Sequence, residues 1–215
     1  MRIRAIICIA ALLLGACAAQ VRTDVTAFHT LSAAPSGKTF MMVPYKNQEG
    51  SLEWRTYADL VSRQLEKYGL VRSQILASSD FAVFMAYAID SGRTSVSAVP
   101  VYGQTGGGTT TTTTGYVGSM PVYGSTYTPP TFGVTGYAPV EDTVYGRAVK
   151  ITILDVKRTI EEKKPVAVYE ATAKSVGSSG NLNVVMPAMI EGTFKDWPGP
   201  SGVTSRQITP LQPAH

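Results

Sequence analysis

The stretch Asp80-Phe81-Ala82-Val83-Phe84-Met85-Ala86-Tyr87-Ala88-Ile89-Asp90 decides the fold, because it is a long apolar run closed at each end by an aspartate. Its odd positions carry large side chains, whereas its even positions carry mostly alanine. This alternation has the two-residue period of a β-strand. The run predicts a central strand whose bulky residues fill one side, while a helix packs closely over the small residues.

The segment before this run has helical spacing instead. One helix face would carry Trp54, Tyr57, Ala58, Val61, Leu65 and Tyr68. Ser51 is suited to cap the start of such a helix, and Gly69 is suited to end it. The pattern predicts an amphipathic helix over residues 52–68 that covers the core.

More strands are predicted on both sides of these two elements. The expected strands cover 21–27 (an edge strand), 39–45, 145–156 and 166–175, with a charged turn at 157–164. A second helix is expected from Asn181 or Asn183 to about Asp196, with Pro187 tolerable only near its start. The segment 200–215 is polar and rich in proline, and is expected to be a disordered tail.

This order of elements predicts an α+β fold. We expect a small antiparallel or mixed sheet of about 4–5 strands with two helices packed on one face. The single domain would span residues 22–199 and contain a long insertion, residues 94–140, rich in Gly, Thr and Tyr.

The insertion is unusual because its 47 residues include no charged side chain. It also repeats itself: Val101-Tyr102-Gly103 returns as Val122-Tyr123-Gly124 and as Val144-Tyr145-Gly146, at spacings of 21 and 22 residues. The low charge and the small number of large aliphatic side chains argue against a second core.

Three interpretations of the insertion stay open. A mobile Gly/Thr/Tyr loop without a ligand is favoured on composition. A protruding hairpin or arm would instead bind an envelope protein or a glycan through stacked tyrosines, with the candidate residues Tyr102, Tyr116, Tyr123, Tyr127 and Tyr137. A phosphate cradle at Gly106–Gly108 is the weakest, because no lysine follows it.

The start of the chain indicates export. A cationic Met1–Arg4 precedes the apolar run Ala5–Leu14, which is too short to span a bilayer. Leu14-Gly15-Ala16-Cys17 resembles the lipobox of bacterial lipoproteins. That resemblance implies a signal peptide over 1–16, a lipidated Cys17 that carries acyl chains such as palmitate, and a tether over 17–21. Ala18, in place of aspartate, resembles the outer-membrane class. The alternative is an ordinary signal peptide with a cysteine there by chance.

Cleavage after residue 16 would leave 199 residues, with 17 basic and 15 acidic side chains. That near balance, without a cluster of basic residues, argues against a nucleic-acid partner. Cys17 would be the single remaining cysteine, so no disulfide is expected.

The sequence offers little catalytic chemistry. After residue 16 the histidines are His29 and His215, and no metal-binding or nucleophile motif is present. We therefore expect no metal, no cofactor and no enzymatic activity. A hydrolase with an unrecognised carboxylate pair among Asp59, Glu66, Asp80 and Asp90 is the minor alternative.

Several segments together resemble a bacterial lipoprotein family built on domain of unknown function 4136. They are the lipobox, Thr39-Phe40, Tyr68-Gly69, Ser79-Asp80-Phe81-Ala82-Val83, Met186-Pro187-Ala188-Met189 and Phe194-Lys195-Asp196-Trp197-Pro198-Gly199. The resemblance covers about residues 22–199 and departs in the length and composition of the insertion. It implies an anchored periplasmic α+β domain without an established activity, and it supplies no catalytic residues.

The functional expectation is a lipid-anchored protein of the Gram-negative envelope. It would be held at the outer membrane through Cys17, face the periplasm, and act as a non-enzymatic binding or assembly accessory. A purely structural envelope lipoprotein with a disordered loop is the alternative. The sequence specifies neither the partner nor the oligomeric state.

Overall fold

The computed structural model describes residues 19–211. The predicted signal peptide, Cys17 and His215 lie outside this range. The chain divides into two compact units: a core unit, formed by residues 19–92 and 144–211, and a second unit over Arg93–Thr143, which we call the ribbon.

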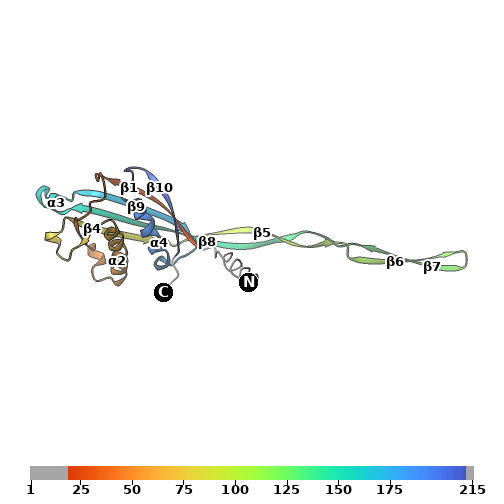
Figure 1. Ribbon diagram of the computed structural model, residues 1–215. Helices are drawn as coiled ribbons and strands as arrows, with labels where there is room; N and C mark the ends of the chain where they lie inside the picture. Colours follow the sequence, from red (N-terminus) through yellow and green to blue (C-terminus); the bar gives the residue numbers. More distant parts are fainter. Residues whose placement is uncertain (1–18, 212–215) are drawn as a thin grey trace, which may run out of the picture. The chain divides into compact units, whose positions relative to one another are not determined.

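The prediction of a sheet of about 4–5 strands was wrong, because the observed sheet is much larger. Eight strands join it, in the order β10-β1-β9-β8-β4-β2-β3, with β5 pairing with β8 (Figure 1). The strands are β1 (Gln20–His29), β2 (Thr39–Met42), β3 (Val71–Arg72), β4 (Phe81–Ile89), β5 (Arg93–Gly106), β8 (Thr131–Asp155), β9 (Ala167–Gly177) and β10 (Thr204–Pro210). A separate two-stranded sheet contains β6 (Thr109–Val117) and β7 (Met120–Thr128).

The helices of the described residues are α2 (Leu52–Lys67), α3 (Val156–Glu162) and α4 (Leu182–Phe194), with short 3-10 turns at Lys46–Gln48 and Leu76–Ser78. The connection from β2 through α2 to β4 returns the chain in the same direction, so these two strands pair in parallel. The pairs β1–β10, β1–β9, β4–β8 and β8–β9 are antiparallel. The sheet is therefore mixed.

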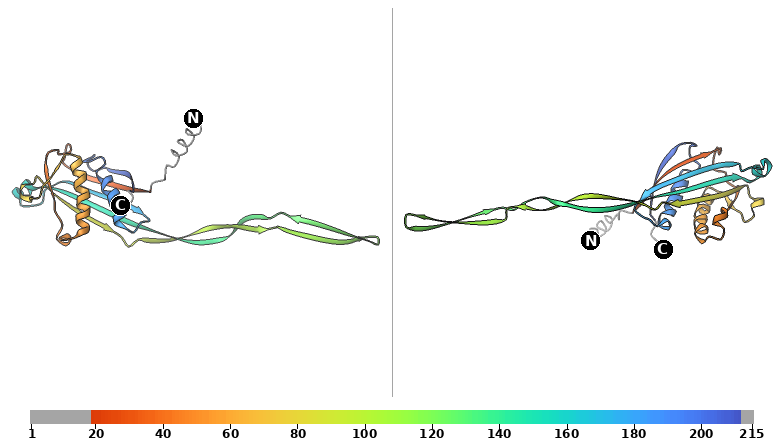
Figure 2. Two further views of the ribbon diagram at one scale, coloured as in Figure 1. Left: turned by 60° about the horizontal axis from the view of Figure 1, so that its bottom comes forward. Right: turned by 180° about the vertical axis from the view of Figure 1, so that it is seen from behind.

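Two helices, α2 and α4, cover one face of the sheet (Figure 2). The predicted helix over 52–68 is present as α2, where the Ser51 hydroxyl accepts a hydrogen bond from the Trp54 backbone nitrogen at 3.1 Å. Its apolar face is buried, including Tyr57, Val61 and Leu65. Burial of this face, rather than helix propensity alone, holds α2 in place.

The face of the central strand β4 that meets the helices is not the predicted one. Its large side chains Phe81, Val83 and Met85 belong to the core beneath α2 and α4, and the Tyr87 ring meets the Tyr57 ring of α2 with centroids 4.9 Å apart. The prediction that a helix packs over the alanines was wrong. Large side chains are needed on this side because they must fill the space between the sheet and the helix layer.

The segment 200–215 was predicted to be a disordered tail, but residues 204–210 form β10. This strand pairs with β1, so β1 is an interior strand and not the predicted edge. Gln207 and Thr209 of β10 are buried, whereas Ile208 is half exposed. The polar side chains face inward and the apolar one faces outward, so the pattern of hydrophobic residues does not indicate this strand.

The helix α4 packs close to this end of the sheet. A Cβ atom at Gly192 would lie 3.3 Å from the Thr209 hydroxyl oxygen and 3.4 Å from the Gln207 Cβ. Asn181 caps the helix through the Asn183 backbone nitrogen at 3.0 Å, and Pro187 lies within it.

The predicted charged turn at 157–164 is largely helical. Asp155 caps α3 by accepting a hydrogen bond from the Arg158 backbone nitrogen at 2.9 Å, and Lys163 ends it with a φ of 50°. The pairs Lys157–Glu161 and Arg158–Glu162 have the i,i+4 spacing that supports a short exposed helix.

Candidate interaction surface

The ribbon contains the predicted insertion, 94–140, and extends slightly beyond it at each end. Antiparallel strands form it, and they wind around each other along its length (Figure 2). The threonine run at 109–114 lies in β6, where β-branched side chains favour an extended backbone. The composition that suggested a mobile loop also suits paired strands.

The turn at the tip has the residue that its geometry requires. Val117 and Met120 are the last register partners, so Gly118 and Ser119 form a two-residue loop. Gly118 has a φ of +64°. Glycine at the first central position with positive φ is typical of a type II′ hairpin turn, whose twist matches that of the strands.

A second pair of glycines lies between β5 and β6, facing two prolines. Gly107 and Gly108 both have a φ of +70°. A Cβ atom at Gly107 would lie 2.0 Å from the Pro129 carbonyl oxygen, which is closer than any real contact. This position therefore requires glycine, and the positive φ of Gly107 and Gly108 accounts for this pair by backbone geometry rather than by a phosphate.

The β6–β7 register places three tyrosines on one face. Tyr116 pairs with Pro121, Thr114 with Tyr123, and Thr110 with Tyr127. Because direct partners share a face and side chains alternate along a strand, these residues all lie on the same side. The opposite face carries Thr109, Thr111, Thr113, Gly115, Val117, Met120, Val122, Gly124, Thr126 and Thr128.

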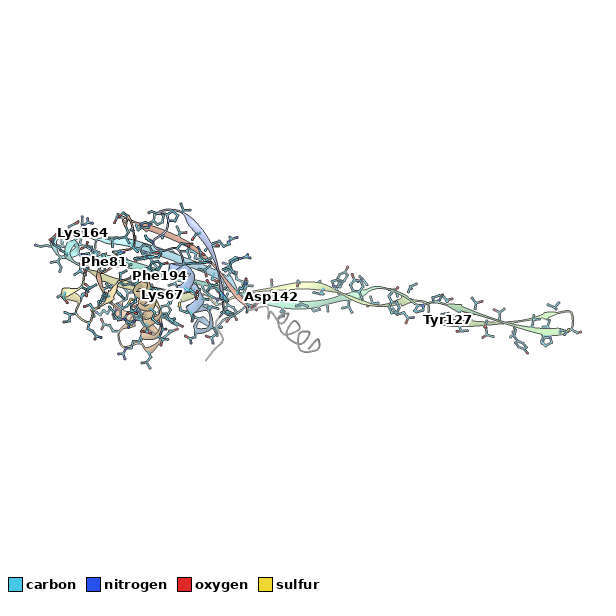
Figure 3. The ribbon with its side chains drawn as sticks, in the orientation of Figure 1. Lys67, Phe81, Tyr127, Asp142, Lys164 and Phe194 are labelled. Carbon is cyan, nitrogen blue, oxygen red and sulfur yellow. The ribbon has the colours of Figure 1, made fainter. Side chains whose placement is uncertain are left out.

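All five predicted tyrosines are exposed. The exposed fractions are 74% for Tyr102, 78% for Tyr116, 76% for Tyr123, 60% for Tyr127 and 69% for Tyr137. Figure 3 shows the side chains of the ribbon, among them the labelled Tyr127, standing away from its backbone. The structure brings Tyr116, Tyr123 and Tyr127 together on one face, while Tyr102 and Tyr137 lie in β5 and β8.

This surface can bind by stacking, by tyrosine hydroxyl groups and by backbone pairing. Aromatic side chains with a polar end are the residues that contribute most to binding surfaces. The ribbon between residues 94 and 140 has no charge with which to recognise a charged ligand.

The other predicted candidates have structural roles. The ring nitrogens of His29 lie 3.0 Å from the Leu31 carbonyl oxygen and 2.8 Å from that of Gly199, so the ring joins β1 to the segment after α4. Asp59 and Glu66 both bind Arg72, at 3.0 and 3.1 Å.

The remaining two aspartates bind backbone groups. Asp80 accepts from the Thr39 nitrogen at 2.8 Å, and Asp90 accepts from the nitrogens of Gly92 and Gly146 at 3.0 and 2.9 Å. Within residues 19–211, no acidic side chain is buried and no group of three or more His, Cys, Asp or Glu residues is placed to hold a metal ion.

Sequence reasoning missed two polar groups of the core unit. The Arg147 guanidinium is buried and donates to the Ser179 carbonyl oxygen through Nε and an Nη atom, at 3.2 and 2.7 Å. Glu53 accepts from the hydroxyls of Tyr57 and Tyr87, at 3.0 and 3.2 Å. Burial, followed by the hydrogen bond to Glu53, raises the pKa of Tyr57. No spacing along the chain predicts either group, because their members come from separate elements.

Across the described residues, the helices are all too short or too polar to span a membrane.

Comparisons with known proteins bear on the family alone. No curated protein matches the sequence. The chain is similar to a PDZ domain protein from Parabacteroides distasonis (15% identity, TM-score 0.42), over 89% of this chain but 39% of that protein. It is also similar to PelC, solved as a dodecamer, from Paraburkholderia phytofirmans (13% identity, TM-score 0.38), over 80% of this chain and 94% of PelC.

The model of a protein family described as a domain of unknown function matches residues 21–199. This match covers most of the chain, including the strands from β1 to β9 and the three helices of the described residues. The resemblance noted in the sequence is thereby confirmed: the chain belongs to the DUF4136 family.

Proposed function

We propose that this protein is a lipid-anchored envelope protein, without catalytic activity, that binds a partner in the periplasm through the ribbon. The observation that carries the proposal is the set of five tyrosines on the ribbon, each at least 60% exposed. A soluble fold rarely keeps this many aromatic side chains in water on one element unless they meet another molecule.

The anchor rests on the start of the sequence. Leu14-Gly15-Ala16-Cys17 follows a short apolar run, and processing at that motif adds at least two acyl chains. Each buried methylene contributes about 0.8 kcal/mol, so two chains hold a protein at the bilayer stably. Ala18 favours the outer membrane, with the domain facing the periplasm.

The partner is expected to be an uncharged or weakly charged surface, either a protein or a glycan. Residues 94–140 of the ribbon have no charge and gain nothing from Coulomb attraction, whereas tyrosine rings stack on sugar faces and on apolar protein patches. The competing function is a purely structural lipoprotein with a disordered loop. The paired register of β6 and β7 favours the first function over this one.

The test removes the ribbon and follows both the anchor and the partner. In the variant lacking residues 94–140, Arg93 and Glu141 are joined. Thr94 follows Arg93 and Thr143 lies two residues after Glu141; the hydroxyl oxygens of these threonines are 2.8 Å apart, so the connection is short. We expect a folded, membrane-bound protein that no longer captures its partner. Recovery of the same envelope partners from this variant would contradict the proposal.

A photo-crosslinking residue at Tyr102, Tyr123 or Tyr137 then identifies what is bound in living cells. Lys67 is an exposed control position, because it lies at the end of α2 and far along the chain from the ribbon. We expect a defined crosslinked product from the tyrosine positions and none from Lys67. Equal yields at all four positions would indicate random contact.

A further inference from the structure

The β6–β7 part of the ribbon has almost no interior. Every side chain of β7 is exposed, and in β6 the one position that is not exposed is Gly115. A two-stranded hairpin is at best marginally stable in water, and three or more strands are needed for independent stability. The described ribbon therefore lacks the burial that usually maintains a sheet.

The outer edge of β6 has none of the features that prevent edge-to-edge pairing. Strands at the edge of a sheet are protected by charged side chains, prolines or bulges. Between Thr109 and Val117, β6 contains neither a charge nor a proline. Its unpaired backbone N–H and C=O groups are thus available to another strand.

The outer edge of β7 differs from that of β6. Pro121 lies in β7 as the partner of Tyr116 and has no N–H to donate. Val117 and Met120 close the two-residue turn as a hydrogen-bonded pair. In an antiparallel ladder the next pair, Tyr116 and Pro121, is not hydrogen-bonded, so its backbone nitrogens face the outer edges of the hairpin. Pro121 therefore interrupts the free edge of β7, so the two edges of the hairpin are not equivalent.

We propose that β6 pairs, edge to edge and antiparallel, with β6 of a second copy of this chain. Two copies related by a two-fold axis present the same strand to each other in opposite directions. The run Thr109–Thr114 then meets itself, and cross-strand threonine pairs stabilise a sheet. No like charges repel, since the ribbon is uncharged between residues 94 and 140.

The resulting four-stranded sheet, β7-β6-β6-β7, has one aromatic face. A two-fold axis perpendicular to the sheet keeps the tyrosine faces of both copies on the same side. Tyr116, Tyr123 and Tyr127 of each copy therefore combine into one surface. The inference deepens the proposed function, because anchoring in one membrane raises the effective concentration of one ribbon near another.

Single cysteines in β6 test the pairing. Cross-strand partners lie within the distance that a disulfide can bridge. We would place cysteine at Thr110, Thr112 or Thr114 in the full-length, membrane-anchored protein and oxidise mildly. For at least one position, we expect at least tenfold more disulfide-linked dimer on a non-reducing gel than for Ser125→Cys.

Ser125→Cys is the matched control, because Ser125 pairs directly with Thr112 but lies in β7. In the proposed sheet the two copies of residue 125 are three strand spacings apart, about 14 Å, too far for a disulfide. The unsubstituted protein, which has Cys17 in common with every variant, gives the background. Equal dimer yields from the β6 positions and Ser125→Cys would overturn the pairing.

A proline then blocks one edge at a time. Thr112→Pro, added to the 110 or 114 cysteine variant, or Thr114→Pro, added to the 112 variant, should abolish the dimer, whereas proline at the β7 partner, Ser125→Pro or Tyr123→Pro, should leave it intact. Both substitutions of a pair make the same demand on the β6–β7 ladder, because the two residues are partners. Loss of the dimer in both variants, or in neither, would also overturn the pairing.

The failure of this inference is separate from the failure of the proposed function. Absent dimers, with an envelope partner still lost on deletion of 94–140, would overturn the self-pairing alone. Dimers that form while no envelope partner depends on the ribbon would overturn the proposed function alone.

Discussion

Asp80 links the start of β4 to the start of β2, because its carboxylate accepts hydrogen bonds from both the backbone nitrogen and the hydroxyl of Thr39, each at 2.8 Å. The Asp80 backbone nitrogen donates in return to the Thr39 hydroxyl at 2.9 Å. Lys38 adds an ion pair at 2.9 Å. The hydrogen bond from Lys38 and that from the Thr39 nitrogen are the largest causes that lower the pKa of Asp80 to about 2.

Stability should therefore depend on the charge of Asp80 at low pH. The folded-state pKa lies below the unfolded value of about 3.9, so the stabilisation is present above pH 4 and is lost as the pH falls toward 2. We expect Asp80→Asn to lower the free energy of unfolding at pH 7 by about 1 to 2 kcal/mol. Urea denaturation at pH 7 and pH 2.5 should show this difference shrinking at the lower pH.

Glu161→Gln is the control for that experiment, because Glu161 is an exposed acid of α3 whose ion pair with Lys157 spans 3.9 Å. Exposed pairs of this kind contribute little. A pH-independent difference for Asp80→Asn would show that the lost contacts, and not the charge, determine its effect.

Truncation should reveal how much β10 contributes to the core unit. Removal of residues 203–215 uncovers the edge of β1 and leaves Thr23, the register partner of Gln207, without its neighbour. We expect a loss of at least about 2 kcal/mol, since buried groups become exposed and a ladder of hydrogen bonds is lost. Removal of residues 212–215 alone should leave the melting temperature unchanged.

The sequence predicted the elements that bury a regular apolar pattern and missed those that do not. Residues 52–67 fold as α2 because Trp54, Tyr57 and Leu65 recur at helical spacing and are all buried. In β10, Gln207 and Thr209 occupy the buried positions, so no hydrophobic period marked it. The sheet was underestimated for the same reason.

The candidate surface could be predicted only in part. The tyrosines were identified by their repeat and are exposed, but the sequence favoured a mobile loop and kept a paired hairpin only as an alternative. Its strands bury no core, so hydrophobic patterning gave no indication of register. Backbone requirements such as the glycine at position 107 become visible only when Pro129 is found opposite.

The face of β4 that meets the helices can be tested by a pair of substitutions. Met85 is fully buried in the core, whereas its neighbour Ala86 points to the opposite face of the sheet. We expect Met85→Ala to cost about 2 to 5 kcal/mol, measured by chemical denaturation. Ala86→Ser should cost much less, and a larger loss at Ala86 than at Met85 would contradict this assignment of faces.

Gly107→Ala should disrupt the ribbon at its glycine–proline junction. The added Cβ would lie 2.0 Å from the Pro129 carbonyl oxygen, and a φ of +70° is unfavourable for alanine. We expect amide hydrogens in β6 and β7 to exchange at least tenfold faster, while those of β4 keep their protection. Gly136→Ala is the control, because its Cβ would meet no atom within 4 Å.

Cys17→Ser tests the anchor on which the proposed function depends. Serine has no thiol to receive the diacylglyceryl group, so labelling by a fatty-acid probe should be abolished and the protein should leave the membrane fraction. Residues 19–211 are unchanged in this variant, so the core unit should keep its circular dichroism spectrum and melting temperature. Self-pairing through β6 should weaken at equal expression, because the loss of the anchor removes the raised local concentration but not the edge itself. Persistent labelling of Cys17→Ser would show that the lipid is attached elsewhere, and an unlabelled protein that stays on the membrane would show that another contact holds it there.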